Sequence, residues 1–164
     1  MRPGDGCTVF ATRAAFAQPG GGSAGSRWAG SRLLDTLYVL GYNGMAWTVE
    51  IYCEETDDQP VPVVENEALA FLDDAETRFD AAKLVGWLHA VAKGMVPPQR
   101  EPESGIGGWT CRYRTDGQIV VIFCEVGPAR LLVVRFARAA STFPTTGDLN
   151  LAARRMRLWS ERYG

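Results

Sequence analysis

A hairpin pattern runs through Trp109-Thr-Cys-Arg-Tyr-Arg-Thr-Asp-Gly-Gln118 and continues into two apolar runs, residues 119–126 and 131–136. Asp116-Gly117 favours a type I′ turn, because aspartate and glycine tolerate the positive φ that both central positions of this turn require. Gly127-Pro128 separates the two apolar runs. Both runs are apolar at almost every position, as strands covered on both faces tend to be. These signals predict a three-stranded antiparallel meander.

The segment before the meander predicts one strand and two helices. Residues 47–53 are rich in aromatic and β-branched residues, which favour a strand. Residues 65–72 have the apolar spacing of a short helix. Asp73-Asp74 can cap a second helix, which Gly94 ends. We expect these two N-terminal helices to pack on one face of the sheet.

The chain after the meander predicts a final basic helix. Thr145 and Asp148 form a variant of the capping box directly after Pro144. Leu149, Ala152, Met156 and Tyr163 then keep helical spacing, and the arginines at positions 154, 155, 157 and 162 fall mostly off that apolar face. The predicted fold class is therefore α+β, an antiparallel meander sheet with two helices before it and one after it.

Residues 1–44 differ in composition from the remainder of the chain. Half of the 18 glycines lie there, concentrated around residues 19–25. A segment with so few packing side chains cannot offset its ordering entropy, so we expect a flexible Gly/Ala-rich extension. Two readings stay open: either translation begins at Met45, or the leader is a genuine extension. Residues 45–164 form the predicted domain.

Charge is unevenly distributed along the chain although the net charge is only -2. Residues 45–108 carry four basic and thirteen acidic groups, whereas residues 109–164 carry nine basic and four acidic groups. This asymmetry is compatible with one face that meets a polyanion, and equally with solvated charge on both sides.

Several classes of site are disfavoured by the sequence. The four cysteines form no C-x-x-C pair, so we expect a reducing, cytoplasmic setting in which Cys111 and Cys124 are free, buried hydrophobes. We expect neither a metal nor a small-molecule cofactor, and no run of about 20 apolar residues suggests a membrane span. His89, the single histidine, reads as a packed or surface helix residue. Residues 105–108 lack the strand-loop-helix context of a phosphate-binding loop.

Arginines are the strongest candidates for chemistry. Side chains alternate along a strand, so Arg112 and Arg114 share one sheet face. Arg135 ends the third predicted strand and Arg138 follows it, so a meander could bring four guanidiniums to one rim. A guanidinium matches phosphate oxygens and can stabilise a pentacoordinate phosphate. The alternative is that these arginines cover apolar surface or pair with acids such as Glu125.

Taken with Ala46-Trp-Thr-Val-Glu-Ile51, this arrangement resembles the RelE/HigB superfamily, in particular the phage-derived HigB-like toxins of type II toxin-antitoxin systems. The likeness covers residues 46–163. Trp109-Thr-Cys-Arg112 is similar to the family's aromatic-Glu-Leu-Arg strand, and Phe136-Ala-Arg138-Ala139 to its phenylalanine followed by two lysines. Thr142-Phe143-Pro144 is similar to its Lys-Thr-Pro segment.

The resemblance implies a RelE-like fold and a ribosome-associated mRNA endoribonuclease that is neutralised by an antitoxin with a helix-turn-helix pattern. In such enzymes the RNA 2′-hydroxyl attacks the adjacent phosphate without metal. Arg112 and Arg138 carry over from the family pattern and would stabilise that phosphate, and Arg100 corresponds to the basic loop residues that precede this strand in relatives. Arg114 and Arg135, which strand geometry alone places near them, would bind RNA together with Arg100.

Three positions depart from the family pattern and leave alternatives open. Thr110, Ala139 and Thr142 replace a glutamate and two lysines, so charged groups are missing where catalysis would use them. Arginine stays charged and is a poor proton donor or acceptor. One alternative is therefore a catalytically degenerate module that only engages an antitoxin or RNA. The other is an unrelated small α+β domain.

Overall fold

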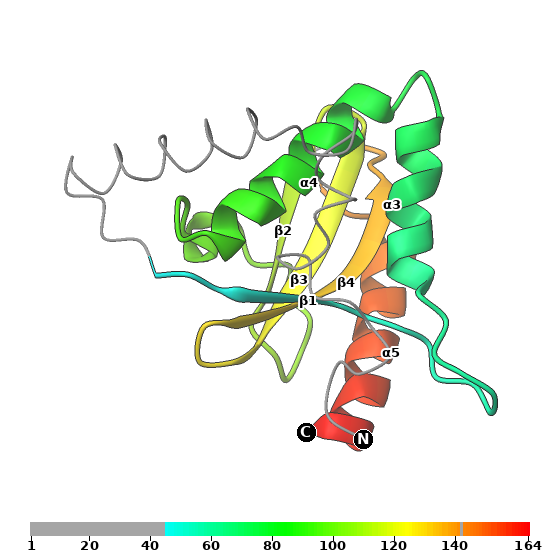
Figure 1. Cartoon of the computed structure of the whole chain (residues 1–164), viewed down its shortest axis with the longest axis vertical. Coiled ribbons are helices and arrows are strands. Elements are labelled where there is room, and N and C mark those ends of the chain that lie inside the picture. The colour runs from blue at the N-terminus through cyan, green and yellow to red at the C-terminus, as the bar shows by residue number, and fades with distance from the viewer. Residues whose placement is uncertain (1–44, 142) are drawn as a thin grey trace, which may run out of the picture.

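Four strands form a mixed sheet at the centre of the computed structural model, which describes residues 45–141 and 143–164 (Figure 1). The strands are β1 (Thr48–Ile51), β2 (Cys111–Asp116), β3 (Ile119–Gly127) and β4 (Arg130–Arg138), in the spatial order β1-β4-β3-β2. β2, β3 and β4 pair antiparallel, which confirms the predicted meander. β1 pairs parallel with β4, so the expectation of a purely antiparallel sheet is wrong. Two helices lie between β1 and the meander, and a parallel pair needs such a long crossover.

The turn between β2 and β3 lies one residue later than predicted. Asp116 pairs with Ile119, so the two loop residues are Gly117 and Gln118. Only Gly117 has a positive φ, of 54°. A positive φ at the first central position alone is typical of a type II′ turn, so the predicted type I′ turn is wrong.

Within the described residues, three α-helices cover the sheet, and Figure 1 shows their arrangement. α3 (Val63–Asp73) packs beside α4 (Arg78–Ala92) and against β4. α4 contacts β1, β2 and β3, and α5 (Thr146–Tyr163) contacts β4. A short 3-10 helix, η2 (Pro98–Arg100), lies in the connection to β2. The N-cap half of the predicted capping box is confirmed, because the Thr145 hydroxyl accepts the Asp148 N–H at 3.1 Å at the start of α5. The Asp148 carboxylate accepts the Thr145 hydroxyl at 2.7 Å.

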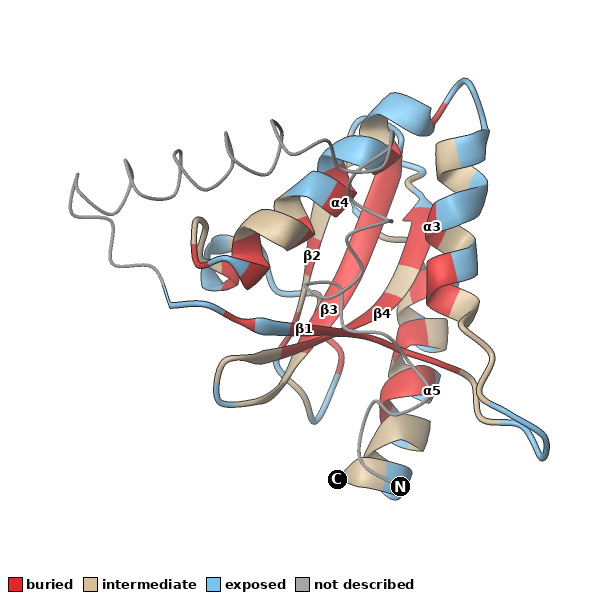
Figure 2. Ribbon diagram, viewed as in Figure 1, coloured by how far each residue is buried: buried red, intermediate tan, exposed pale blue. Residues whose placement is uncertain are grey.

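α4 and α5 lie on opposite faces of the sheet. The Phe123 ring of β3 contacts Trp87 of α4, with the ring centroids 5.2 Å apart. Its neighbour Ile122 points to the other face and pairs with Arg135, whose guanidinium reaches Asp148 in the first turn of α5. The sheet is therefore covered on both sides, and residues 119–124 of β3 are all buried, as their continuous apolar sequence predicts (Figure 2).

Beyond the end of β1, one edge of β4 has no neighbouring strand, and two helix side chains hydrogen-bond to the backbone groups there. β1 pairs with β4 only from Arg130 to Val133. Past that point, Glu67 of α3 accepts the Phe136 N–H at 3.1 Å. Arg155 of α5 donates to the Val134 carbonyl at 2.8 Å. These bonds replace those of a neighbouring strand and leave fewer unpaired backbone groups at the edge.

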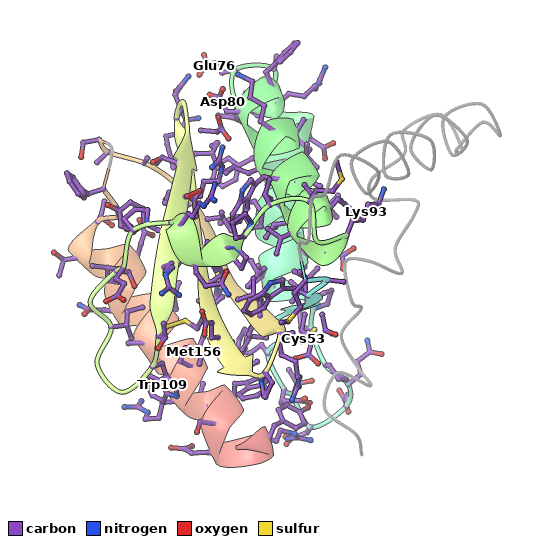
Figure 3. The ribbon with its side chains drawn as sticks, turned by 90° about the vertical axis from the view of Figure 1, so that its left-hand side faces the viewer. Cys53, Glu76, Asp80, Lys93, Trp109 and Met156 are labelled. Atoms are coloured by element: carbon purple, nitrogen blue, oxygen red, sulfur yellow. A yellow bond between two sulfur atoms is a disulfide. The ribbon has the colours of Figure 1, made fainter. Side chains whose placement is uncertain are left out.

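β2 and β3 are joined covalently by a disulfide between Cys111 and Cys124 (Figure 3). The two residues are direct cross-strand partners with a Cα–Cα distance of 3.9 Å, and both are buried. The expectation that these cysteines are free is therefore wrong. Spacing along the chain gave no indication of the pair, because it is the hairpin register that brings the two residues together.

The predicted flexible extension, residues 1–44, and Thr142 lie outside the described residues. In the part of the chain that the structure covers, no helix has the length and apolar character needed to cross a membrane.

Candidate functional site

The strand register decides which arginines lie together. Arg114 pairs with Val121, which pairs in turn with Phe136, so these three residues share the face covered by α4. Arg112 lies two residues from Arg114 on the same face. Arg138 lies two residues from Phe136 and points the same way. We call Arg112, Arg114 and Arg138 the arginine face.

Arg135 lies on the opposite side of the sheet. Its partner in β3 is Ile122, which pairs with Tyr113 rather than with an arginine. The Arg135 guanidinium donates to Glu67 at 2.6 Å and to Asp148 at 3.1 Å. The expected convergence of four guanidiniums on one rim is therefore not observed, because alternation along β4 separates Arg135 from Arg138 and Arg114.

Arg112 is enclosed by carboxylates. Its guanidinium lies 2.8 Å from Glu125 and 3.7 Å from Glu103, and its side chain is only 13% exposed. Glu125 follows Phe123 by two residues and so lies on the same sheet face. Glu103 comes from the segment that forms an isolated bridge with Arg112 along the outer edge of β2. The alternative of pairing with Glu125, drawn from the sequence, is what the structure shows.

Arg114 is held in a similar way. It lies 2.5 Å from Glu101 and 3.6 Å from Asp116. Its guanidinium also lies over the Trp87 ring of α4, 5.2 Å from the centroid, in a cation–π contact. The Arg114 side chain is therefore held in place, and its charge is balanced, by other residues of the same chain.

Arg138 is the most exposed member of the arginine face, with 48% of its side chain accessible. It donates to Gln118 in the β2–β3 turn at 2.8 Å and lies 3.7 Å from Asp74, between α3 and α4. Arg100, the remaining predicted RNA-binding residue, is exposed on η2 and forms no ion pair within the described part of the chain. The Arg100 guanidinium is therefore exposed, but it belongs to η2 and not to the sheet that carries the other arginines.

The charge balance around β2 is negative. Two arginines, Arg112 and Arg114, are surrounded by four carboxylates, which belong to Glu101, Glu103, Asp116 and Glu125. Bound phosphate would have to displace a carboxylate that already neutralises its arginine, and the released carboxylate would repel it. The acidic members other than Glu125 were missed by sequence reasoning. The signal for Glu101 and Glu103 was their place in the loop before the arginine-bearing strand, and Asp116 ends that strand itself.

His89 lies half-buried in α4. Burial and then the nearby charge of Lys93 lower the pKa of His89 below its usual value, so its neutral form dominates at pH 7. Among the described residues, no group of three or more histidine, cysteine, aspartate or glutamate side chains could hold a metal ion.

The structure thus defines an α+β domain with a mixed four-stranded sheet and arginines neutralised on one face. No protein-family model, no curated protein and no solved structure matches the chain.

Proposed function

We propose that this chain is a RelE/HigB-like domain that acts by binding a protein partner of the antitoxin type, without cleaving RNA. The observation that carries this proposal is the excess of carboxylates around Arg112 and Arg114. The order of strand, two helices, meander and basic helix supports the family resemblance, whereas the charge of the face argues against phosphate chemistry.

Electrostatics favour a protein partner over RNA. Nucleic-acid binding depends on basic groups that neutralise phosphates and release counterions. Here the two most enclosed arginines of the face already pair with acids, so bound phosphate would first have to break those ion pairs. A protein partner with a helix-turn-helix pattern needs no such rearrangement.

RNA cleavage would also lack a residue that could act as the general acid or general base. Arginine remains charged at physiological pH. Glu125 and Glu101 lie within hydrogen-bond distance of Arg112 and Arg114, respectively, so their charge is already engaged. The family's lysine positions carry Ala139 and Thr142. A degenerate binding module accounts for all of these features.

A metal-independent endoribonuclease toxin is the second candidate. It is favoured by the shared orientation of Arg112, Arg114 and Arg138 and by the exposure of Arg138. In this case Arg112 and Arg138 would stabilise the phosphate, while the 2′-hydroxyl attacks it in messenger RNA at the ribosome. Both candidates act in the cytoplasm, a compartment in which a disulfide such as Cys111–Cys124 is uncommon.

Induced expression in a bacterial host separates the two candidates. The wild-type chain should neither arrest growth nor cleave translated messages, and it should co-purify with the product of a neighbouring small gene of helix-turn-helix pattern. Arg112→Ala and Arg138→Ala would be compared with Arg157→Ala, an exposed arginine on α5. Growth arrest and cleavage that both disappear in the first two variants, yet persist in the third, would overturn our proposal in favour of the nuclease.

A further inference from the structure

A second site lies away from the arginine face, between α5 and the segment that follows β1. A pocket of about 400 Å³ is lined there by Tyr52, Glu54, Glu55, Trp159, Arg162 and Tyr163, among others. Its volume is within the range of small-ligand pockets. We call it the α5 pocket. It shares no residue with the arginine face, so an inference about it does not depend on the proposed function.

Aromatic rings form much of the wall. Trp159 and Tyr163 contact each other with their ring centroids 5.7 Å apart. One cation of the pocket already uses such a ring: the Arg162 guanidinium lies 5.9 Å from the Tyr163 centroid. Arg155, which does not line the pocket, lies 5.6 Å from the Tyr52 centroid. Such ring faces are negative and favour a positive group.

Two carboxylates give the pocket its polarity. Glu55 accepts the Tyr163 hydroxyl at 2.7 Å, and Glu54 lies 3.4 Å from the Tyr52 hydroxyl. Burial, and then the Glu54 charge, raise the pKa of Tyr52 to about 12. Tyr52 is therefore neutral at physiological pH and donates to Glu54.

The ion pairs of these carboxylates are loose. Arg154 lies 3.7 Å from Glu54, and Arg162 lies 3.5 Å from Glu55. Both distances exceed those of close charge-assisted bonds, about 2.7 to 2.9 Å. Both arginine side chains are about half exposed, at 56% and 47%. An ionised carboxylate offers roughly four acceptor sites, so Glu54 and Glu55 retain capacity for another donor.

We propose that the α5 pocket binds the guanidinium of an arginine side chain from a partner polypeptide, with Arg162 as an internal stand-in that the ligand displaces. A planar guanidinium can stack on Trp159 or Tyr163 while its N–H groups reach Glu54 and Glu55, whereas a compact ammonium group satisfies only part of this geometry.

The test is a titration of the full chain with N-acetyl-arginine methylamide, followed by NMR. The indole N–H signal of Trp159 would be assigned with Trp159→Phe. We expect saturable shifts of this signal and of amides in residues 52–55 and 158–163. N-acetyl-lysine methylamide should bind at least about tenfold more weakly.

Variants test the two parts of the proposal: that Glu54 and Glu55 bind the ligand, and that Arg162 competes with it. Glu54→Gln/Glu55→Gln should raise the dissociation constant at least about tenfold. Asp73→Asn/Glu76→Gln, which removes the same charge from the distant α3–α4 turn, should change it less than about twofold. Arg162→Ala should tighten binding several-fold, because it removes the competing cation. Far-UV circular dichroism and thermal melting would verify that each variant is folded.

Three results would each overturn the inference. The first is an absence of saturable shifts at millimolar arginine ligand. The second is equal binding of the lysine ligand, which would exclude guanidinium selectivity. The third is weaker binding by folded Arg162→Ala, which would make Arg162 part of the site rather than a stand-in.

Discussion

Glu67 of α3 and Arg155 of α5 form a two-point ion pair, with N–O distances of 2.9 and 3.1 Å, across the open part of the β4 edge. Their side chains are only 17% and 7% exposed. Each also bonds to the β4 backbone, Glu67 to the Phe136 N–H and Arg155 to the Val134 carbonyl. This pair therefore joins two helices that are distant in sequence to one strand edge.

Arg155→Ala should lower the free energy of unfolding by about 3 kcal/mol or more, because it leaves a largely buried carboxylate with one partner fewer and a strand carbonyl without its donor. Urea denaturation followed by circular dichroism measures this change. Arg157→Ala, on the same helix but exposed, should change stability by less than about 0.5 kcal/mol. Equal effects of the two substitutions would show that the ion pair is not stabilising.

The Cys111–Cys124 disulfide should stabilise the hairpin by restricting the unfolded chain. The two cysteines are 13 residues apart, and closing a loop of about that length contributes about 3 kcal/mol. Cys111→Ser/Cys124→Ser should therefore lower the melting temperature by roughly 6 to 12 °C. Cys53 is also disulfide-bonded and stays in this variant, so a reductant should lower the melting temperature of the wild type by more than that of the variant.

Thiol trapping in cells tests whether the Cys111–Cys124 disulfide forms in the compartment where the protein acts. Disulfides are uncommon in a reducing cytosol. If the bond forms where the protein acts, Cys111 and Cys124 should resist alkylation until a reductant is added to the denatured chain. Rapid labelling of both residues in denatured extracts would show that the cell keeps the hairpin reduced.

Gly117→Ala should destabilise the protein by about 1 kcal/mol or more. The residue has a φ of 54°, and an added Cβ would overlap the carboxylate of Asp80. The same carboxylate accepts the Gln118 N–H at 3.0 Å and anchors the turn to α4. Gly107→Ala is the matched control, since a Cβ there meets nothing within 4 Å. Equal melting temperatures for the two variants would show that a Cβ at position 117 does not clash with Asp80.

Neutralising the acids beside Arg112 should create RNA affinity that the native face lacks. Glu103→Gln/Glu125→Gln changes the charge around Arg112 and Arg114 from -2 to zero. We expect binding of single-stranded RNA at low salt to tighten at least about tenfold, with a steeper salt dependence. Glu76→Gln/Glu161→Gln removes the same charge elsewhere and should have a smaller effect. Tight binding by the wild type would instead favour the nuclease candidate.

Tyr52 should ionise near pH 12, because burial and Glu54 raise its pKa from 10. A raised folded-state pKa gives stability that is complete below pH 10 and is lost as the pH rises towards about 12. Absorbance at alkaline pH should show a late tyrosine titration that Tyr52→Phe reduces, while Tyr163, whose pKa is also raised by burial and by its bond to Glu55, still contributes. Titration of all tyrosines near pH 10 in the folded protein would disprove the shift.

Local patterns in the sequence predicted much of the fold. Continuous apolar runs separated by turn residues predicted the meander, although the first turn differs in position and type. Thr145 with Asp148 predicted the start of α5, because such signals act between near neighbours. The parallel pairing of β1 and the Cys111–Cys124 bond were missed, since both depend on register between segments.

The candidate site was predicted only in part. Placing Arg112 and Arg114 on one face needed only strand periodicity, and the register confirms it. Their neutralisation depends on Glu101 and Glu103, which a loop folds back onto β2. The α5 pocket joins Glu55 to Tyr163 across 108 residues of sequence, and no local pattern indicates such a contact.

The β1–β4 pairing also constrains the order of assembly. Glu50 and Arg130 are bonded across the parallel pair yet are separated by 80 positions in the chain. In a nascent polypeptide, β1 therefore has no strand partner until β4 has left the ribosome. Contacts of such long range slow folding. The closing step of this domain comes near the end of its synthesis, and a binding partner that engages β1 beforehand would compete with it.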